Sequence, residues 1–352
     1  MGSPIPNYAN YADPDFAGSL QLIATSGDPI TTPCKALDLA VSMAKQALLS
    51  DPTADHEHLP ILGHAGLLDS AQRLVFGATA EEVKTIASIQ TIAGTGANHL
   101  DSGIKRQTYP YFDKKSFTID YNGIISTLQL KATEGDVVVL HGCGHNPTRH
   151  DFTKDQWKAI ANDFATGDLA EDAWSVRHFF RNASLEILVA QSFPKNFGLY
   201  GERVGALHVV CRTEVTRLKV HNMLTRLSRA EITTPPINGA RTMAKVLGDK
   251  DLKQQWQNDL FHMSDRMRSM RERLVNALQK RQTPGSWDHI LMDIGMFSMT
   301  CLQPGRIRAL KEEYLYIFFL WEEYPRQAVL TEHNVEYVAQ AFHTVIVAAK
   351  PE

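Results

Sequence analysis

Short apolar runs alternate with amphipathic stretches through the middle of the chain, from about His58 to about Arg241. The runs are Ile89–Ile92, Val137–Leu140, Leu185–Ala190 and Val204–Cys211. Because strands that are joined by crossover helices pair in parallel, this alternation predicts a mostly parallel, doubly wound sheet whose strands are buried between helices. Ligand-binding loops are then expected at the carboxyl edge of that sheet.

Helical periodicity dominates the segment that follows. From Ala240 to Gln282 an unbroken run rich in Lys, Arg, Gln, Met and Leu predicts one long helix, which Gly285 ends. A last amphipathic helix is expected around Val335–Ala349, and the apolar run Tyr314–Trp321 is expected to form a buried strand. That run is far shorter than the roughly 20 residues of a transmembrane helix.

The chain is therefore expected to have an α/β fold with two domains. The large domain, which carries the sheet, is placed at residues 46–259, and a smaller α+β domain is assembled from residues 1–45 and 260–352. With 352 residues, of which 43% are hydrophobic, the chain can bury a large core. Its net charge of -3 gives no bias toward nucleic acid or an anionic membrane, so neither is expected as a partner.

Cysteine usage bears on the compartment and on metal binding. Four cysteines are spread along the chain without paired spacing: Cys34, Cys143, Cys211 and Cys301. This pattern favours reduced thiols and a cytoplasmic location, and it argues against a zinc site, so no metal is expected. The first thirty residues are polar, contain proline and lack arginine, unlike a signal or transit peptide.

A polar loop after the third apolar run sets one lysine among groups that suit a phosphorylated carbonyl cofactor. The stretch Gln191–Gly205 reads QSFPKNFGLYGERVG, with Lys195 three residues after Ser192 and eight before Arg203. A hydroxyl and a guanidinium near an amine are what an anionic phosphate on such a cofactor requires. Burial beside another cation would lower the pKa of the lysine toward its nucleophilic form. The loop therefore suggests pyridoxal phosphate.

The same loop resembles the lysine motif of the aspartate aminotransferases, which are class I, fold type I pyridoxal-phosphate enzymes. Further segments resemble that family in the same order along the chain: HEHLPILG (56–63), IQTIAGTGA (89–97), VVLHGCGHNPT (138–148), FATGDLAEDAWSVR (164–177), TTPPINGAR (233–241) and WDHILMDIGMFSMT (287–300). The resemblance implies the fold of that family, the cofactor pyridoxal 5'-phosphate and a homodimer. It also implies transamination between amino acids and 2-oxo acids, with dicarboxylates such as aspartate and 2-oxoglutarate favoured.

The resemblance assigns roles to single residues. Lys195 would form the Schiff base with the cofactor and then move the proton of the reaction. The phosphate would be held by Gly94, Thr95, Ser192, Arg203 and His58. His58 stands where the family has a tyrosine, and it would act from the partner subunit. Asn146 and Tyr200 would meet the ring hydroxyl, and Arg229 would reach the substrate's distal carboxylate in the other subunit.

Two features of the family are missing. Between Ala161 and Phe164 the chain lacks a stretch long enough for a whole strand, which in the family carries the aspartate that bonds the pyridine nitrogen and a tyrosine that bonds the ring oxygen. A second gap, after Ala97, removes the tryptophan that stacks on the ring. Without the aspartate the ring withdraws electrons less well, so transamination is expected to slow by orders of magnitude. Asp163, at the edge of the first gap, is the candidate substitute.

The arginine that would bind the substrate's α-carboxylate is displaced as well. Counting back from Leu330 puts Tyr324 at its place, and Arg326 stands two residues later. An offset of two residues keeps the same face of a strand and moves the side chain by roughly 6 to 7 Å, so Arg326 is the candidate for this role.

Three interpretations of function stay open. The first is an aspartate-type aminotransferase with full, reduced or altered activity. The second is a degenerate paralogue that is catalytically weak or inactive. The third is a pyridoxal-phosphate enzyme that performs specialised amino-acid tailoring, such as racemisation. Gaps of this size are also what a misassembled gene model would produce.

Overall fold

The computed structural model describes residues 39–52, 55–99, 107–113, 116, 118–133, 136–143, 145, 148, 150–153, 155–157, 172–182, 186–292, 302–314, 330, 332 and 334–348. The helices within them are α2 (Leu39–Leu49), α3 (Ala65–Phe76), α4 (Ala93–His99), α5 (Tyr121–Lys131), α8 (Trp174–Asn182), α9 (Glu214–Glu231), α10 (Asn238–Gly248), α11 (Lys250–Lys280), α12 (His289–Met292), α13 (Pro304–Tyr314) and α14 (Val335–Ala348). The strands are β1 (Ile86–Ile92), β2 (Phe112–Asp113), β3 (Thr118–Ile119), β4 (Leu188–Ser192) and β5 (Val204–Val210), and short 3-10 turns cover Glu82–Thr85 and Tyr200–Glu202.

The main described sheet has the strand order β1-β5-β4. Both pairings are antiparallel: Ile86 faces Val210 at one end of the first pair, and Ser192 faces Gly205 in the second. The parallel pairing predicted from the sequence is therefore not found between these strands. The reason is the short connection from β4 to β5, residues 193–203, which contains no crossover helix. Since β5 runs against both neighbours, β1 and β4 point the same way.

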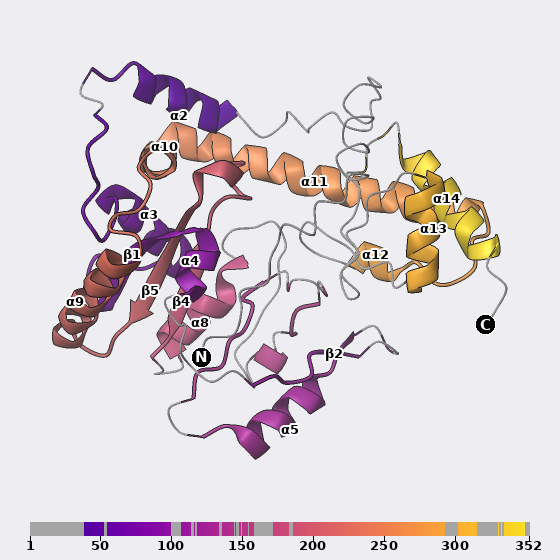
Figure 1. Cartoon of the computed structure of the whole chain (residues 1–352), viewed down its shortest axis with the longest axis horizontal. Helices are drawn as coiled ribbons and strands as arrows, with labels where there is room; N and C mark the ends of the chain where they lie inside the picture. Colours follow the sequence, from indigo (N-terminus) through magenta and orange to yellow (C-terminus); the bar gives the residue numbers. More distant parts are fainter. Residues whose placement is uncertain are drawn as a thin grey trace, which may run out of the picture.

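Helices cover both faces of this sheet (Figure 1). On one face Val204 and Ala206 pack with Met243 of α10, and α3 lies beside it. On the other face Ile89 and Leu207 pack with Leu224 of α9. Burial on both sides explains why β5 is a nearly continuous apolar run, whereas β1 also carries the buried polar residues Ser88, Gln90 and Thr91.

Two predicted buried strands are more exposed than expected. β4 pairs only with β5 among the described strands, and Leu188 is 45% exposed. Val137, Val138 and Val139 do not form a strand and are 51%, 42% and 64% exposed. A strand is buried only when neighbours cover it, so such exposure is what the strand-length gap expected after Ala161 would produce.

The long predicted helix is two helices. The capping residue is Asp249, whose backbone is extended and whose carboxylate accepts from Asp251 N at 3.1 Å and Leu252 N at 3.2 Å. An aspartate that satisfies free N–H groups in this way starts a new helix, which the periodicity alone does not reveal. The final helix, predicted to end at Ala349, ends at Ala348. Tyr314 ends α13, and the rest of the predicted strand Tyr314–Trp321 lies outside the described residues.

α11 extends from α2 and α10 at one end to α13 and α14 at the other (Figure 1), and it contributes to a hydrophobic cluster at each end. Its first turns contribute Leu252 and Trp256 to the cluster under the sheet, together with α2 and α10. Its last turns contribute Leu274 and Leu278 to a second cluster with α13 and α14. The domain boundary predicted at residues 259 and 260 falls between these clusters and stays a prediction. Within the described part, no helix is both long and apolar enough to cross a membrane.

Candidate active site

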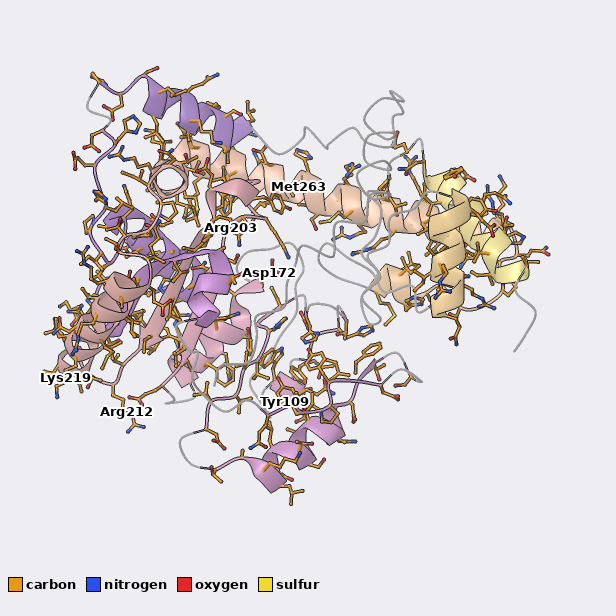
Figure 2. All side chains as sticks on the ribbon, viewed as in Figure 1. Tyr109, Asp172, Arg203, Arg212, Lys219 and Met263 are labelled. Carbon is orange, nitrogen blue, oxygen red and sulfur yellow. The ribbon has the colours of Figure 1, made fainter. Side chains whose placement is uncertain are left out.

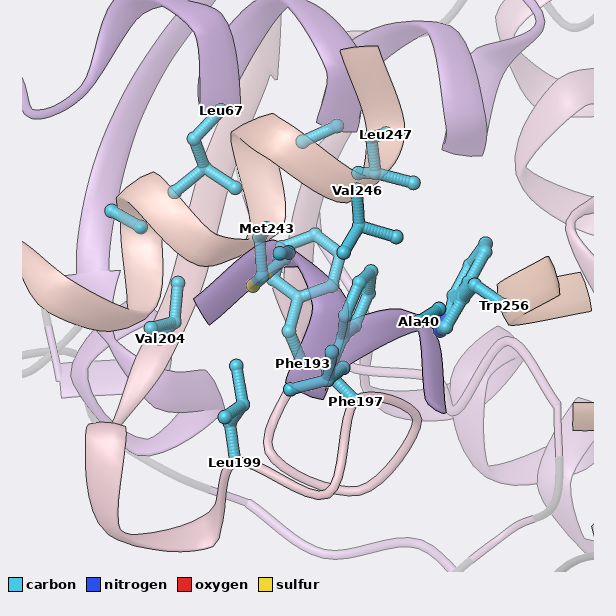
Figure 3. Close-up of a cluster of buried hydrophobic side chains, with 14 of the residues drawn as sticks. Ala40, Leu67, Phe193, Phe197, Leu199, Val204, Met243, Val246, Leu247 and Trp256 are labelled. Carbon is cyan, nitrogen blue, oxygen red and sulfur yellow. The ribbon is translucent and has the colours of Figure 1, made fainter. Parts of the chain in front are cut away.

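The lysine loop between β4 and β5 is anchored by apolar side chains on both sides of Lys195. Phe193 and Phe197 are fully buried beneath α10 and the start of α11 (Figure 3), and Phe197 N donates to Phe193 O at 3.2 Å. The Phe197 ring stacks on Trp256 with 4.6 Å between centroids, and the indole Nε1 donates to Asn196 O at 2.8 Å. Residues four apart on a helical turn share one side, so Lys195, midway between them, faces outward. Its side chain is exposed, so the burial that would lower the pKa of this lysine is not found within the described chain.

The turn at Ala93 and Gly94 packs directly on the ends of β4 and β5. A Cβ atom on Gly94 would lie 3.2 Å from Ser192 Cβ, so the serine lies against this turn. Ala93 N donates to Arg203 O at 3.0 Å, and a Cβ atom on Gly205 would come within 2.6 Å of Ala93 C. Backbone packing thus brings together three of the predicted phosphate residues, Gly94, Ser192 and Arg203.

A cavity of about 310 Å³ lies beside this turn. The end of β1, the first turns of α4 and the end of α9 line it, and its polar lining includes Thr95, Arg203, Ser228 and Glu231. Arg203 lies close to α4 (Figure 2), and its guanidinium donates to Tyr200 O at 3.3 Å. Hydroxyl groups and a guanidinium around a partly apolar cavity fit a phosphorylated aromatic cofactor.

Backbone strain gathers around the cavity. The described chain has four non-glycine residues with positive φ: Ala93 at 54°, Arg203 at 51°, Thr233 at 66° and Gln282 at 52°. Ala93 lies at the turn beside the cavity, Arg203 lies in the cavity wall, and Thr233 directly follows the cavity residue Ile232. A conformation of this kind costs about 1 to 3 kcal/mol and persists where the surrounding structure imposes it, which is common at binding sites.

The remaining described candidates, Lys195, Tyr200, Arg229 and His58, do not line this cavity. Tyr200 is 50% exposed, and its partial burial raises the pKa of the phenol, which therefore keeps its proton at neutral pH. Arg229 is exposed at the end of α9, next to the cavity residue Ser228. His58 is exposed on the segment between α2 and α3.

Asn146 and Arg326 lie outside the described residues, as do Tyr324 and Asp163. Next to Asn146, the His145 ring stacks on Tyr111 with 3.6 Å between centroids. Nearby, burial raises the pKa of the Cys143 thiol to about 12, with further contributions from the negative charges of Asp172 and Asp151. The predicted contacts with the cofactor ring oxygen and the substrate α-carboxylate stay predictions.

The contribution of α9 to the cavity was not predictable from the residue pattern. Ser228, Glu231 and Ile232 lie in its last turn and just after it, more than a hundred residues from β1 along the chain. Their residue types and spacing are those of an ordinary helix end, and only the packing of α9 on β1 places them here. In the described part of the chain, no group of His, Cys, Asp and Glu side chains is arranged to hold a metal ion.

Comparison with known proteins defines the class. Residues 100–342 match the family model "Aminotransferase class I and II", and the chain belongs to this family. It is 35% identical over 357 residues to the cytoplasmic aspartate aminotransferase of Schizosaccharomyces pombe, with 87% of each chain covered.

Solved structures agree with this assignment. The aspartate aminotransferase from Saccharomyces cerevisiae cytoplasm has a TM-score of 0.84 at 31% identity, covering 99% of this chain and 98% of that one. An aromatic-amino-acid aminotransferase from Burkholderia pseudomallei, covalently bound to pyridoxal phosphate, has a TM-score of 0.84 at 28% identity over 98% of both chains. The predicted fold type I architecture is confirmed. The chain is a pyridoxal-phosphate-dependent transaminase that acts on amino acids and 2-oxo acids.

Proposed function

We propose that this protein is a cytoplasmic, homodimeric aminotransferase that exchanges amino groups between dicarboxylic amino acids and 2-oxo acids, of the aspartate and 2-oxoglutarate type. Two relatives described above are named as aspartate aminotransferases of the cytoplasm. The relative that is named for aromatic amino acids makes aromatic donors the alternative substrates.

The observation that carries the proposal is the grouping of phosphate ligands at one turn. Thr95 and Arg203 line one cavity, and Ser192 lies against Gly94 beside it. Two hydroxyls and a guanidinium would hold the phosphate by charge-assisted hydrogen bonds, which are the strongest contacts available to a dianion. His58 would complete this set from the partner subunit, since it is exposed and does not line the cavity of its own chain.

The other candidate residues would act on the ring and on the substrate. The bound cofactor supplies an electron-poor ring that draws electrons from the substrate carbon as that carbon loses its proton. Lys195 would hold the cofactor covalently and then carry this proton. Tyr200, which keeps its phenol proton, and Asn146 would donate to the ring oxygen. Arg229 of the partner subunit would bind the distal carboxylate, and Arg326 the α-carboxylate.

A second candidate function is a degenerate paralogue with weak or no turnover. The exposure of Leu188 and of Val137, Val138 and Val139 favours it, because it fits the loss of the neighbouring strand that would carry the pyridine-nitrogen aspartate. A third, specialised amino-acid tailoring, would need a ring that works without that carboxylate.

Covalent labelling tests the proposal. The purified protein is mixed with pyridoxal phosphate, reduced with borohydride and mapped by peptide mass spectrometry, and the label should appear on Lys195. Lys195→Ala should abolish the label, whereas Lys219→Ala, which removes an exposed lysine of α9, should not. A protein that stays colourless with saturating cofactor and unlabelled after reduction would rule out the catalytic functions. Light scattering should give the mass of a dimer at micromolar concentration.

A further inference from the structure

A chain of hydrogen-bonded polar side chains, three of them buried and the last half-buried, crosses the sheet beneath the candidate site. Gln72 Nε2 of α3 donates to Ser88 Oγ of β1 over 2.5 Å, and Ser88 Oγ lies 2.7 Å from His208 Nδ1 of β5. On the far side of the ring, His208 Nε2 lies 3.1 Å from Gln191 Oε1 of β4. The chain therefore ties one helix and all three strands of the sheet together.

The Gln191 oxygen gives this chain one consistent direction. Oε1 can only accept, so His208 Nε2 carries the ring proton and donates it to Gln191. Nδ1 of the neutral ring then accepts from the Ser88 hydroxyl, which accepts in turn from Gln72 Nε2. The ring is fully buried, with the Phe76 ring edge-on at 5.6 Å, and burial lowers the pKa of His208 to about 3. The imidazole is therefore neutral at neutral pH.

The end of this chain lies next to the phosphate residues. Ser88 and Val189 both pair with His208, and Gln191, two residues beyond Val189, lies on the same face of β4. The next residue, Ser192, is on the opposite face, against Gly94. A slip of β4 by one residue would turn Ser192 away from that turn and point a different side chain at it.

The side chains of β4 itself add few other constraints on its register, and the buried Phe193 anchors the loop that follows. Alternate residues along it are exposed, and β5 is its one neighbour among the described strands. An edge strand with one weakly buried face is prone to slip unless a specific contact pins it. The bond from His208 to Gln191 supplies such a contact, because a slipped register would leave the buried His208 ring nitrogen and the half-buried Gln191 amide without these partners.

We propose that His208 is a positioning residue for the cofactor phosphate: through Gln191 it fixes β4 in the register that holds Ser192 against Gly94. The inference rests on the proposed function, since it assumes that Ser192 binds the phosphate. His208 touches neither cofactor nor substrate in this arrangement, and acts through β4 alone.

The experiment compares two ligands that differ only in the phosphate. Dissociation constants of pyridoxal phosphate and of pyridoxal are measured by absorbance titration on the folded protein, and their ratio reports the phosphate contact alone. The variants are Gln191→Leu, His208→Leu, Ser192→Ala and the double variant Ser192→Ala with Gln191→Leu. Each of the three single variants should reduce the preference for the phosphorylated ligand about tenfold, the value of one charge-assisted hydrogen bond. The double variant should lose no more than Ser192→Ala, because both changes remove the same contact.

A matched control separates positioning from general destabilisation. His221 of α9 is also part-buried, and its Nε2 accepts from Ser88 N at 3.2 Å, but it has no bond to β4. His221→Leu should lower the urea midpoint of unfolding and leave the ligand ratio unchanged. Gln191→Leu, a half-buried position, keeps the test usable should His208→Leu fail to fold.

The outcomes separate the positioning role of His208 from the proposed function on which it rests. A wild-type protein with no preference for the phosphorylated ligand contradicts the proposed function itself. If the wild type prefers pyridoxal phosphate and Ser192→Ala removes that preference, but Gln191→Leu keeps it, the positioning role of His208 is wrong and the proposed function stands. An unchanged ratio in Ser192→Ala would overturn the positioning role as well, since β4 would then hold nothing against the phosphate.

Discussion

Substitution of His208 by glutamine should flatten the pH dependence of stability below neutral pH. An ordinary histidine has a pKa of about 6.5 in the unfolded chain, whereas burial lowers the pKa of His208 in the folded protein to about 3. Below pH 6.5 the unfolded chain binds a proton that the folded chain excludes. The stabilising contribution is therefore complete above pH 6.5 and is lost progressively as the pH falls toward 3.

The size of the effect at pH 5.0 depends little on the folded pKa, provided that His208 stays neutral there. Proton binding to the unfolded histidine at this pH lowers the free energy of unfolding by about 2 kcal/mol relative to pH 7.5. Glutamine does not titrate, so the variant should escape this loss, whatever its stability at pH 7.5. Burial also lowers the pKa of His64 and of His221, aided by the charges of Arg241 and Arg217. Both histidines remain in the variant, so their contribution to the pH dependence of the free energy of unfolding is the same in the variant and in the wild type.

The assay is urea unfolding of the cofactor-free protein at pH 7.5 and 5.0, followed by tryptophan fluorescence. The drop in free energy between the two pH values should be about 2 kcal/mol smaller in His208→Gln than in the wild type. His262→Gln, which changes an exposed histidine of α11, should keep the wild-type drop. Equal drops in His208→Gln and the wild type would refute the reasoning, because His208 would then take up its proton in the folded state too.

Three further results are expected. Arg229→Leu should raise the activation free energy that corresponds to kcat/KM by about 1.5 to 3 kcal/mol for aspartate and glutamate, and leave that for alanine nearly unchanged. An equal loss for all donors would remove the dicarboxylate assignment. Wild-type turnover should be low for every donor, and rapid conversion of the bound cofactor to its amine form by aspartate, in a single-turnover experiment, would show that another group such as Asp163 serves the ring nitrogen. Gly205→Ala should lower the free energy of unfolding by about 1 to 3 kcal/mol, because its Cβ would meet the Ala93 backbone at 2.6 Å. Gly201→Ala, with no atom within 4 Å of the added Cβ, is the control, and a cost as large as that of Gly205→Ala would contradict the argument.

Apolar runs that are buried on both faces were predictable from the sequence. β5 was expected at Val204–Cys211 and is found at Val204–Val210, and the last helix differs from its expected range by one residue. Such an apolar run can be interpreted in only one way, because neighbouring elements cover both of its faces. Asp249 shows the opposite case, since an aspartate in a periodic run can lie on a solvated face or cap a new helix, and its backbone conformation decides.

The residues of the candidate site also divide into those that were predictable from the sequence and those that were not. Gly94, Ser192 and Arg203 were predictable because two local motifs carry them, the glycine turn after β1 and the loop between β4 and β5, and contacts of that turn with Ser192 and Arg203 bring the motifs together. Glu231 was not predictable, because its place in the cavity depends on how α9 packs. The roles of His58 and Arg229 depend on a second copy of the chain, which no local pattern encodes.

The residues expected to bind the cofactor phosphate and those expected to bind its ring lie on different parts of the chain. The phosphate residues stand on β1, β5 and β4, which are held by the core under α10 and by the chain from Gln72 to Gln191. The ring half is predicted to lie in the segment that follows the exposed Val137–Val139, where Asn146 is the candidate, and near the gap in which the aspartate of the family is expected to be missing. The contacts that would anchor the phosphate do not depend on the strand that is expected to be missing. Cofactor affinity should therefore be kept in this protein while turnover is reduced. Tight binding of pyridoxal phosphate combined with slow amino transfer is therefore the expected phenotype, and restoring a carboxylate at the ring nitrogen should raise turnover without changing the preference for the phosphorylated cofactor.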